Sequence, residues 1–120
     1  MTTLSLRERR DALHQEIARV LRLGLQGEET PGETDQFVAG FVHLAVSASE
    51  GDTAPRDEYL NVVVPSVRAS GLPLSVSMAG MVAIAMGGTA VLEGEERTWW
   101  YRFCTDYAAR MATLWETSAS

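Results

Sequence analysis

One run of residues limits what this chain can fold into. From Leu72 to Leu92, 21 consecutive residues carry no charge. Gly71 and Pro73 stand at its start, and glycine commonly ends a helix whereas proline readily begins one. The sequence therefore predicts a helix over about 73–92. Such a helix can cross a membrane, form the middle of a core, or face a second copy of the chain.

The membrane interpretation of this run is the less favoured one. Its length suffices to span hydrocarbon. No basic cluster flanks it, however, and Glu93, Glu95 and Glu96 follow it directly. Its hydrophobicity is also diluted, by Pro73, Ser75, Ser77, Gly80, Gly87, Gly88 and Thr89. We expect no membrane association; a protein that needs detergent to stay in solution would overturn this.

Composition sets the broad class. With 120 residues, 46% hydrophobic and 22% charged, the chain is predicted to form one globular domain over 1–120. A net charge of −6 argues against nucleic acid as a partner, because such binding needs a basic face. Cys104 is the only cysteine, which fits a reducing, cytoplasmic setting, and its place among aromatic residues predicts a buried, inert thiol.

The rest of the chain also follows the helical period. The sequence has none of the turn dipeptides typical of β-hairpins and no sustained alternation of apolar and polar residues. We therefore expect an all-α bundle of about five to six helices, of which the last two are long. Ser5 and Glu8 have the spacing of a capping box at the first helix. Pro65 predicts a break or kink in the third helix, since proline disfavours helical backbone in the residue before it. The expected helices span about 5–24, 35–49, 55–68, 73–92 and 95–116.

The 73–92 helix needs more covering than one small domain usually provides. Small residues and flexible methionines on it suit close contact with another helix, and a two-fold homodimer is the commonest source of one. Aromatic residues at helical spacing in the last helix are also candidates, although some of them must belong to the core. The predicted dimer-interface residues are Met78, Gly80, Met81, Ala85, Trp100, Phe103, Tyr107, Met111 and Trp115.

Residues for catalysis or metal binding are not recognisable in the pattern. His14 and His43 are the only histidines, and neither has a second ligand three or four residues away. His43 is expected at the surface, because it lies beside the apolar stripe of its helix. No nucleophile–base pair or phosphate-binding loop occurs, so neither an enzyme nor a cofactor is predicted. A haem protein that uses His43 or His14 as axial ligand is a less favoured alternative.

The turn before the uncharged helix resembles a known motif. In haem-based globin-coupled sensors, the segment between the F and G helices reads His-x-x-Ile-Gly-Leu-Pro, followed by an aromatic-Met-Gly-Ala-like helix start. This chain has Val67-Arg68-Ala69-Ser70-Gly71-Leu72-Pro73 and then Met78-Ala79-Gly80. Val67 stands where the iron-binding histidine would be. The chain therefore resembles the non-haem globin-like domains of RsbR-type stressosome proteins and the related sporulation-inhibitory sensor globins.

The resemblance implies a globin-like fold and a sensory or regulatory domain that acts as a homodimer in signal transduction. It also implies dimerisation through the last two helices, a further signalling protein as partner, and a fatty-acid-like ligand where haem would sit. For this chain we expect such an apolar ligand near Val63, Val67 and Met78. The alternative is a small helical protein–protein interaction adaptor without a ligand.

Overall fold

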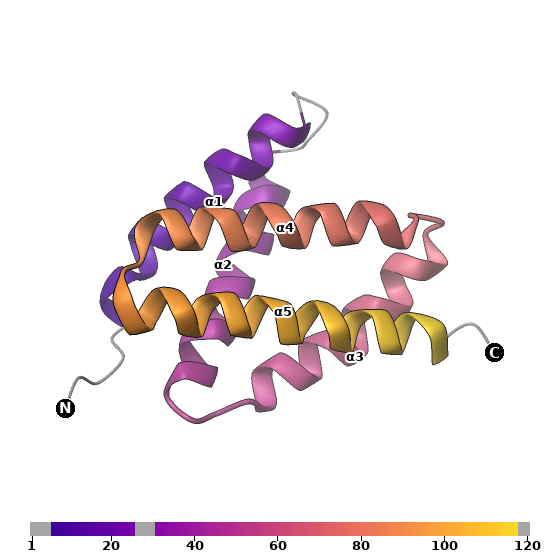
Figure 1. Cartoon of the computed structure of the whole chain (residues 1–120). Coiled ribbons are helices and arrows are strands. Elements are labelled where there is room, and N and C mark those ends of the chain that lie inside the picture. Colours follow the sequence, from indigo (N-terminus) through magenta and orange to yellow (C-terminus); the bar gives the residue numbers. More distant parts are fainter. Residues whose placement is uncertain (1–5, 26–30, 118–120) are drawn as a thin grey trace.

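The computed structural model describes residues 6–25 and 31–117, which form an all-helical bundle without strands in those ranges. A one-turn 3₁₀ helix (η1) leads directly into the first α-helix (Figure 1). The elements are η1 (Leu6–Arg9), α1 (Arg10–Leu25), α2 (Pro31–Ser49), α3 (Ala54–Ala69), α4 (Leu74–Val91) and α5 (Gly94–Thr117). The expected all-α class is confirmed, and the last helix is the longest of the set.

The helices form two crossing layers. α4 and α5 run antiparallel, side by side, and make the front layer in Figure 1. α1 and α2 cross behind them, with α1 packed on α4, and α3 lies against α5. Because a short turn joins α4 to α5, their outer surfaces together form one continuous face of the molecule.

Two adjacent glycines let the layers approach closely. A Cβ atom added at Gly87 would lie 3.0 Å from the Ile17 Cα atom of α1. At Gly88 it would lie 2.0 Å from the Trp100 Nε1 atom of α5. Trp100 is fully buried and donates a hydrogen bond from Nε1 to the Ile84 carbonyl oxygen at 3.3 Å. α4 thus fits against α1 and α5 because it has no side chain at these two positions.

An aromatic cluster joins α2 to α5 in the core. The Phe41 ring of α2 meets three α5 rings edge-on, with centroid distances of 5.9 Å to Trp100, 5.9 Å to Phe103 and 5.1 Å to Tyr107. Such edge-to-face pairs contribute roughly 0.5–1.5 kcal/mol each beyond the area they bury. The predicted aromatic stripe of the last helix is therefore largely core.

The predicted break at Pro65 is wrong. α3 continues through this proline to Ala69. Because Pro65 has no N–H group, the carbonyl oxygen of Asn61 lacks its usual helical donor. Both residues are exposed, so water can donate a hydrogen bond to this oxygen instead. Val64, which the proline restricts, is instead held in helical conformation by its burial in the core. Packing on one face of α3 outweighs the local preference.

Other helix limits differ less from expectation. α2 begins at Pro31, earlier than predicted. Proline is well tolerated in the first turn of a helix, because the N–H group that it lacks would have no partner within the helix there. α4 and α5 each agree with the predicted spans to within about one residue. Ser5, the predicted cap of the first helix, lies outside the described residues.

Candidate functional site

An apolar cavity of about 200 Å³ lies behind α4, where that helix meets α3 and α5. Two of its residues, Val63 and Val67, come from the α3 face that the sequence marked for an apolar ligand. Gly80 lies on its α4 side, and a Cβ atom there would have no neighbour within 4 Å. The complete lining is Phe37, Val63, Val64, Val67, Leu72, Ser77, Gly80, Met81, Ile84, Tyr107, Met111 and Trp115.

The chemistry of this lining is nearly uniform. Ser77, Tyr107 and Trp115 are the lining residues whose side chains carry a polar group, and none of the lining residues is charged. Burial and the nearby Tyr59 raise the pKa of Tyr107, so its phenol stays neutral. Arg68, on the same α3 turn as Val67, already donates a hydrogen bond to the Trp115 carbonyl oxygen at 2.5 Å. The cavity therefore offers dispersion contacts and no counter-charge.

Empty space of this size is unusual in a small core. Protein interiors are packed like organic crystals, with few voids larger than a water molecule. Phe37 and Leu72 are partly exposed, at 37% and 41%, so two of its lining residues also reach the molecular surface.

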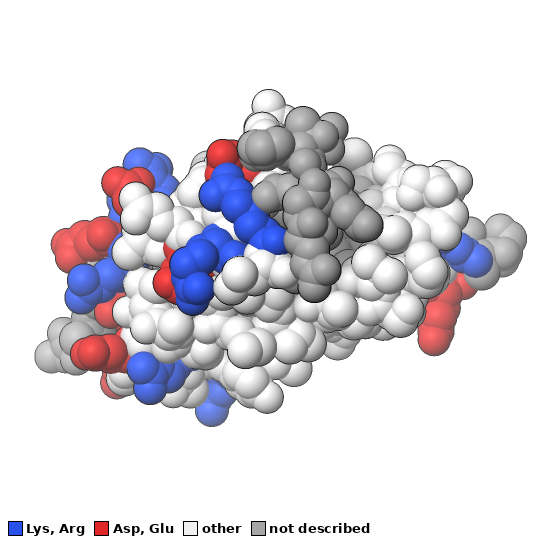
Figure 2. Space-filling model, turned by 90° about the horizontal axis from the view of Figure 1, so that it is seen from above, with Lys and Arg blue, Asp and Glu red and all other residues white. Residues whose placement is uncertain are grey.

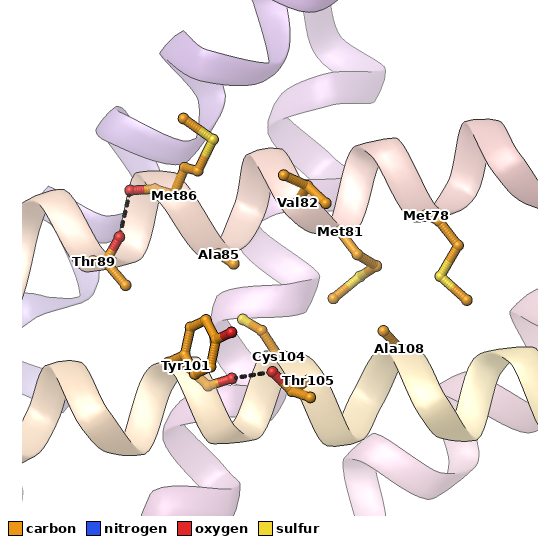
Figure 3. A pocket seen from close by; sticks show the side chains of 10 residues that line it. All are labelled: Met78, Met81, Val82, Ala85, Met86, Thr89, Tyr101, Cys104, Thr105 and Ala108. Atoms are coloured by element: carbon orange, nitrogen blue, oxygen red, sulfur yellow. Dashed lines mark hydrogen bonds between the residues drawn. The ribbon is translucent and has the colours of Figure 1, made fainter.

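A second hollow lies on a neighbouring face of α4. It is a groove of about 410 Å³ between the outer surfaces of α4 and α5 (Figure 3). α4 contributes Met78, Met81, Val82, Ala85, Met86 and Thr89 to it, and α5 contributes Tyr101, Cys104, Thr105 and Ala108. These ten residues, called the α4–α5 face below, are all uncharged.

Large apolar side chains on this face are left uncovered. Val82 is 59% exposed, Met86 61% and Tyr101 61%. α4 has no charged residue anywhere along its length. In Figure 2 the charged side chains gather mainly toward the left end and upper middle of the view, with a further small group at the right end, and the lower half between these ends is uncharged. Exposed apolar surface that is contiguous in this way marks interaction sites more often than scattered single residues do.

Met81 is the one residue that lines both hollows. It is buried in α4, and its side chain extends between α4 and α5 (Figure 3). Methionine has three rotatable side-chain bonds and adapts readily to a change in its surroundings. A change in the cavity can therefore reach the α4–α5 face through a single side chain.

Charged groups form ion pairs away from the α4–α5 face. Arg56 of α3 reaches Asp106 of α5 at 3.4 Å, and Arg110 contacts the same carboxylate at 2.8 Å. Arg7 pairs with Glu50 at 2.7 Å near the start of α1. The Arg56–Asp106 pair joins α3 to α5 and the Arg7–Glu50 pair joins η1 to the end of α2, whereas Arg110–Asp106 lies within α5.

Cys104 forms part of the groove wall as a buried thiol. Its side chain is only 3% exposed, and burial raises its pKa to about 12. A thiol of this kind is protonated and unreactive at neutral pH. The predicted inert role of this cysteine agrees with its surroundings.

The residues predicted for a dimer interface divide into three groups. Met81, Trp100, Phe103, Tyr107 and Met111 are buried within the single chain and so belong to the core. Gly80 and Trp115 line the cavity. Only Met78 and Ala85, together with the Met81 side chain, border the groove.

The predicted ligand-binding residues are also separated. Val63 and Val67 lie together in the cavity, but Met78 lies in the groove on the neighbouring face of α4. Val82 and Tyr101 of the α4–α5 face were not predicted, and Met86 was counted among the flexible methionines but not among the predicted interface residues. The four-residue spacing of Met78, Val82 and Met86 was the available signal, because it places all three on one stripe of a helix.

Within residues 6–25 and 31–117, no group of three or more His, Cys, Asp or Glu side chains gathers that could hold a metal ion. His43 is exposed, as expected. His14 lies 3.4 Å from the Asp35 carboxylate, from Nε2 to Oδ1.

By length and composition alone, α4 also qualifies as a candidate membrane span, with mean hydropathy 1.7 and 22% of its residues buried in the bundle. A single helix of this kind is weak evidence for a span; the core helix of a soluble protein passes the same test, but such a helix is mostly buried and α4 is not.

Comparison of the chain with protein-family models, with curated proteins and with solved structures finds no match.

Proposed function

We propose that this chain is a non-haem, globin-like sensory or regulatory domain that works as a homodimer and has no catalytic role. In this proposal the α4–α5 face joins two copies and the cavity behind α4 holds an apolar ligand. The observation that carries the proposal is the uncovered, uncharged α4–α5 face, on which Val82, Met86 and Tyr101 are each more than half exposed.

The lack of charge on this face is compatible with a second copy as its occupant. Each chain has a net charge of −6, which by itself opposes association of two copies, and contact through uncharged surface avoids adding close like-charge pairs to that repulsion. The α4–α5 face is such a surface. A two-fold axis brings the same patch of both copies together, and an uncharged patch is automatically compatible with itself.

The dimensions of the face are also sufficient. α4 has 18 residues, which gives a length of roughly 27 Å at about 1.5 Å per residue. A face two helices wide, at about 10 Å for each helix, would bury roughly 500 Å² of surface on each partner, or about 1,000 Å² in total. That total reaches the approximate lower limit for a specific interface. Thr105 and Ala108 are small enough to let the helices of the partner come close.

The position of Val67, the arrangement of the last two helices and the volume of the cavity support the resemblance to non-haem globin-like sensors. The resemblance placed Val67 where a haem ligand would stand, and Val67 lines the cavity. It also assigned dimerisation to the last two helices, which here are the antiparallel pair that forms the uncovered face. The cavity, about 200 Å³, is below the roughly 300–1,000 Å³ typical of drug-sized ligands. This volume favours a non-haem role.

Sedimentation velocity at micromolar concentration tests the proposed dimer. We expect a species of twice the 13.1 kDa chain mass for the wild-type protein. Val82→Glu should yield monomers, because a buried carboxylate without a partner is costly at an interface. Val62→Glu is the matched control, since Val62 is 67% exposed on α3, away from the proposed interface.

A wild-type protein that stays monomeric would contradict the proposal. So would equal dissociation of the Val82→Glu and Val62→Glu variants, because the effect would then not belong to the α4–α5 face. A monomer with an empty cavity would leave the adaptor alternative, in which the face binds a different protein.

A further inference from the structure

We propose that the cavity behind α4 binds small uncharged apolar molecules, of about the size of toluene, and that Met81 transmits their binding to the α4–α5 face. Transmission to the α4–α5 face rests on the proposed function, because it requires the dimer, whereas ligand binding does not. The ligand proposed here is a compact molecule without a charged group, in place of a fatty-acid-like one.

Volume sets the size of the ligand. A dry apolar cavity of roughly 150 Å³ is known to hold benzene or xenon. The present cavity, of about 200 Å³, thus suits one aromatic ring or a short aliphatic molecule. Gly80 contributes to that volume directly, since a side chain at this position would project into space that has no atom within 4 Å of its Cβ.

The lining sets the charge of the ligand. A carboxylate placed here would lose its hydration without gaining a partner, because no lining residue is basic. Arg68, the basic residue next to Val67, is already engaged with the Trp115 carbonyl oxygen. A neutral molecule has no such cost and gains contact with Val63, Met111 and their neighbours.

Met81 provides the connection to the dimer. Its side chain lies between α4 and α5 and lines both hollows, the cavity together with Gly80 and the groove together with Met78. A ligand that fills the cavity restricts the conformations of the Met81 side chain. The groove beside Met78 and Ala85 then changes shape, and with it the fit of the second copy.

The test of binding uses toluene as the probe. Two charged molecules serve for comparison: benzoate, which has the same ring, and palmitate, which has a long aliphatic chain. The readout is the ¹³C-methyl NMR spectrum of the methionines. We expect millimolar toluene to shift the Met111 and Met81 signals, and benzoate and palmitate to leave them unchanged. Gly80→Leu should abolish the toluene shift by filling the cavity, while Gly40→Leu, on α2 and outside the lining, should retain it.

No shift with toluene in the folded wild-type protein would overturn the site. An equal response to benzoate or palmitate would overturn the proposed ligand class. Retention of the toluene shift in a folded Gly80→Leu protein would show that toluene binds elsewhere. Because Gly80→Leu can disturb folding, the milder Gly80→Ala should weaken toluene binding without abolishing it.

The transmission step is measured separately. Saturating toluene should change the dissociation constant of the wild-type dimer by about five-fold or more, the lower range of usual coupling between sites. Met81→Leu, which conserves volume but has fewer conformations, should bind toluene and show a much smaller change. An unchanged dimer constant with toluene bound would refute the Met81 connection. A monomeric protein that binds toluene would refute the proposed dimer and retain the ligand site.

Discussion

Gly88→Ala should destabilise the protein although alanine favours helices. The substitution alone would add about 1 kcal/mol of helix stability in an exposed position. Here the new Cβ atom would lie 2.0 Å from Trp100 Nε1 and 2.2 Å from Trp100 Cε2. Atoms do not approach so closely, and the indole is a rigid ring in a fully buried place. Either the ring or the α4 backbone must therefore move.

Two losses follow from that movement. Overpacking a well-packed core costs roughly 1–3 kcal/mol. The hydrogen bond from Trp100 Nε1 to the Ile84 carbonyl oxygen would also stretch or break, and a buried group without its partner costs about 1–3 kcal/mol. After the gain in helix propensity, we expect a net loss of about 1–5 kcal/mol in the free energy of unfolding.

Urea denaturation followed by circular dichroism measures this loss, and two other glycines of α4 serve as controls. Gly80→Ala makes the same chemical change where nothing lies within 4 Å, and we expect it to be neutral or stabilising. Gly87→Ala, with its Cβ 3.0 Å from the Ile17 backbone, should fall between the two. A Gly88→Ala variant as stable as Gly80→Ala would refute the described contact of α4 with Trp100.

Further predictions concern Pro65 and Cys104. Pro65→Ala should raise the free energy of unfolding by about 1–2 kcal/mol in urea denaturation, because an exposed helix-interior position gains an amide donor; a decrease would show that the proline shapes α3 usefully. The Cys104 thiol should resist iodoacetamide at pH 8 until the protein unfolds, and rapid alkylation of folded protein would contradict its burial. The free energy of unfolding should also fall as pH rises from about 9 toward 12, because the thiol ionises at its ordinary pKa of 9.0 when unfolded but only near 12 when folded; Cys104→Ala should lessen that slope.

The sequence was most informative where local signals and packing agree. Gly71 adopts a φ of +87° and ends the turn before α4, as a glycine at a helix stop should. The limits of α4 and α5 followed from such signals. Pro65 was misjudged because its effect on the backbone is local, whereas the burial of Leu60 and Val64 that holds α3 together is not visible in a short window.

The division between core and surface was harder to predict. Helical periodicity shows that Trp100 and Tyr107 share a face of α5, but it does not say whether that face meets Phe41 of the same chain or another molecule. Likewise, a glycine in a helix does not reveal its neighbour. Gly88 abuts Trp100 whereas Gly80 borders a cavity, and only the crossing of the helices distinguishes them.

The pairing of two chains through the α4–α5 face is tested most directly by NMR on a mixture. One population carries ¹³C-labelled methionine methyl groups in a deuterated background, and the other is unlabelled. We predict intermolecular nuclear Overhauser effects at Met86 and Met78, which border the groove, and none at Met111, which is 8% exposed and faces the cavity. Effects that are absent at Met86, or confined to methyl groups off this face, would contradict the account.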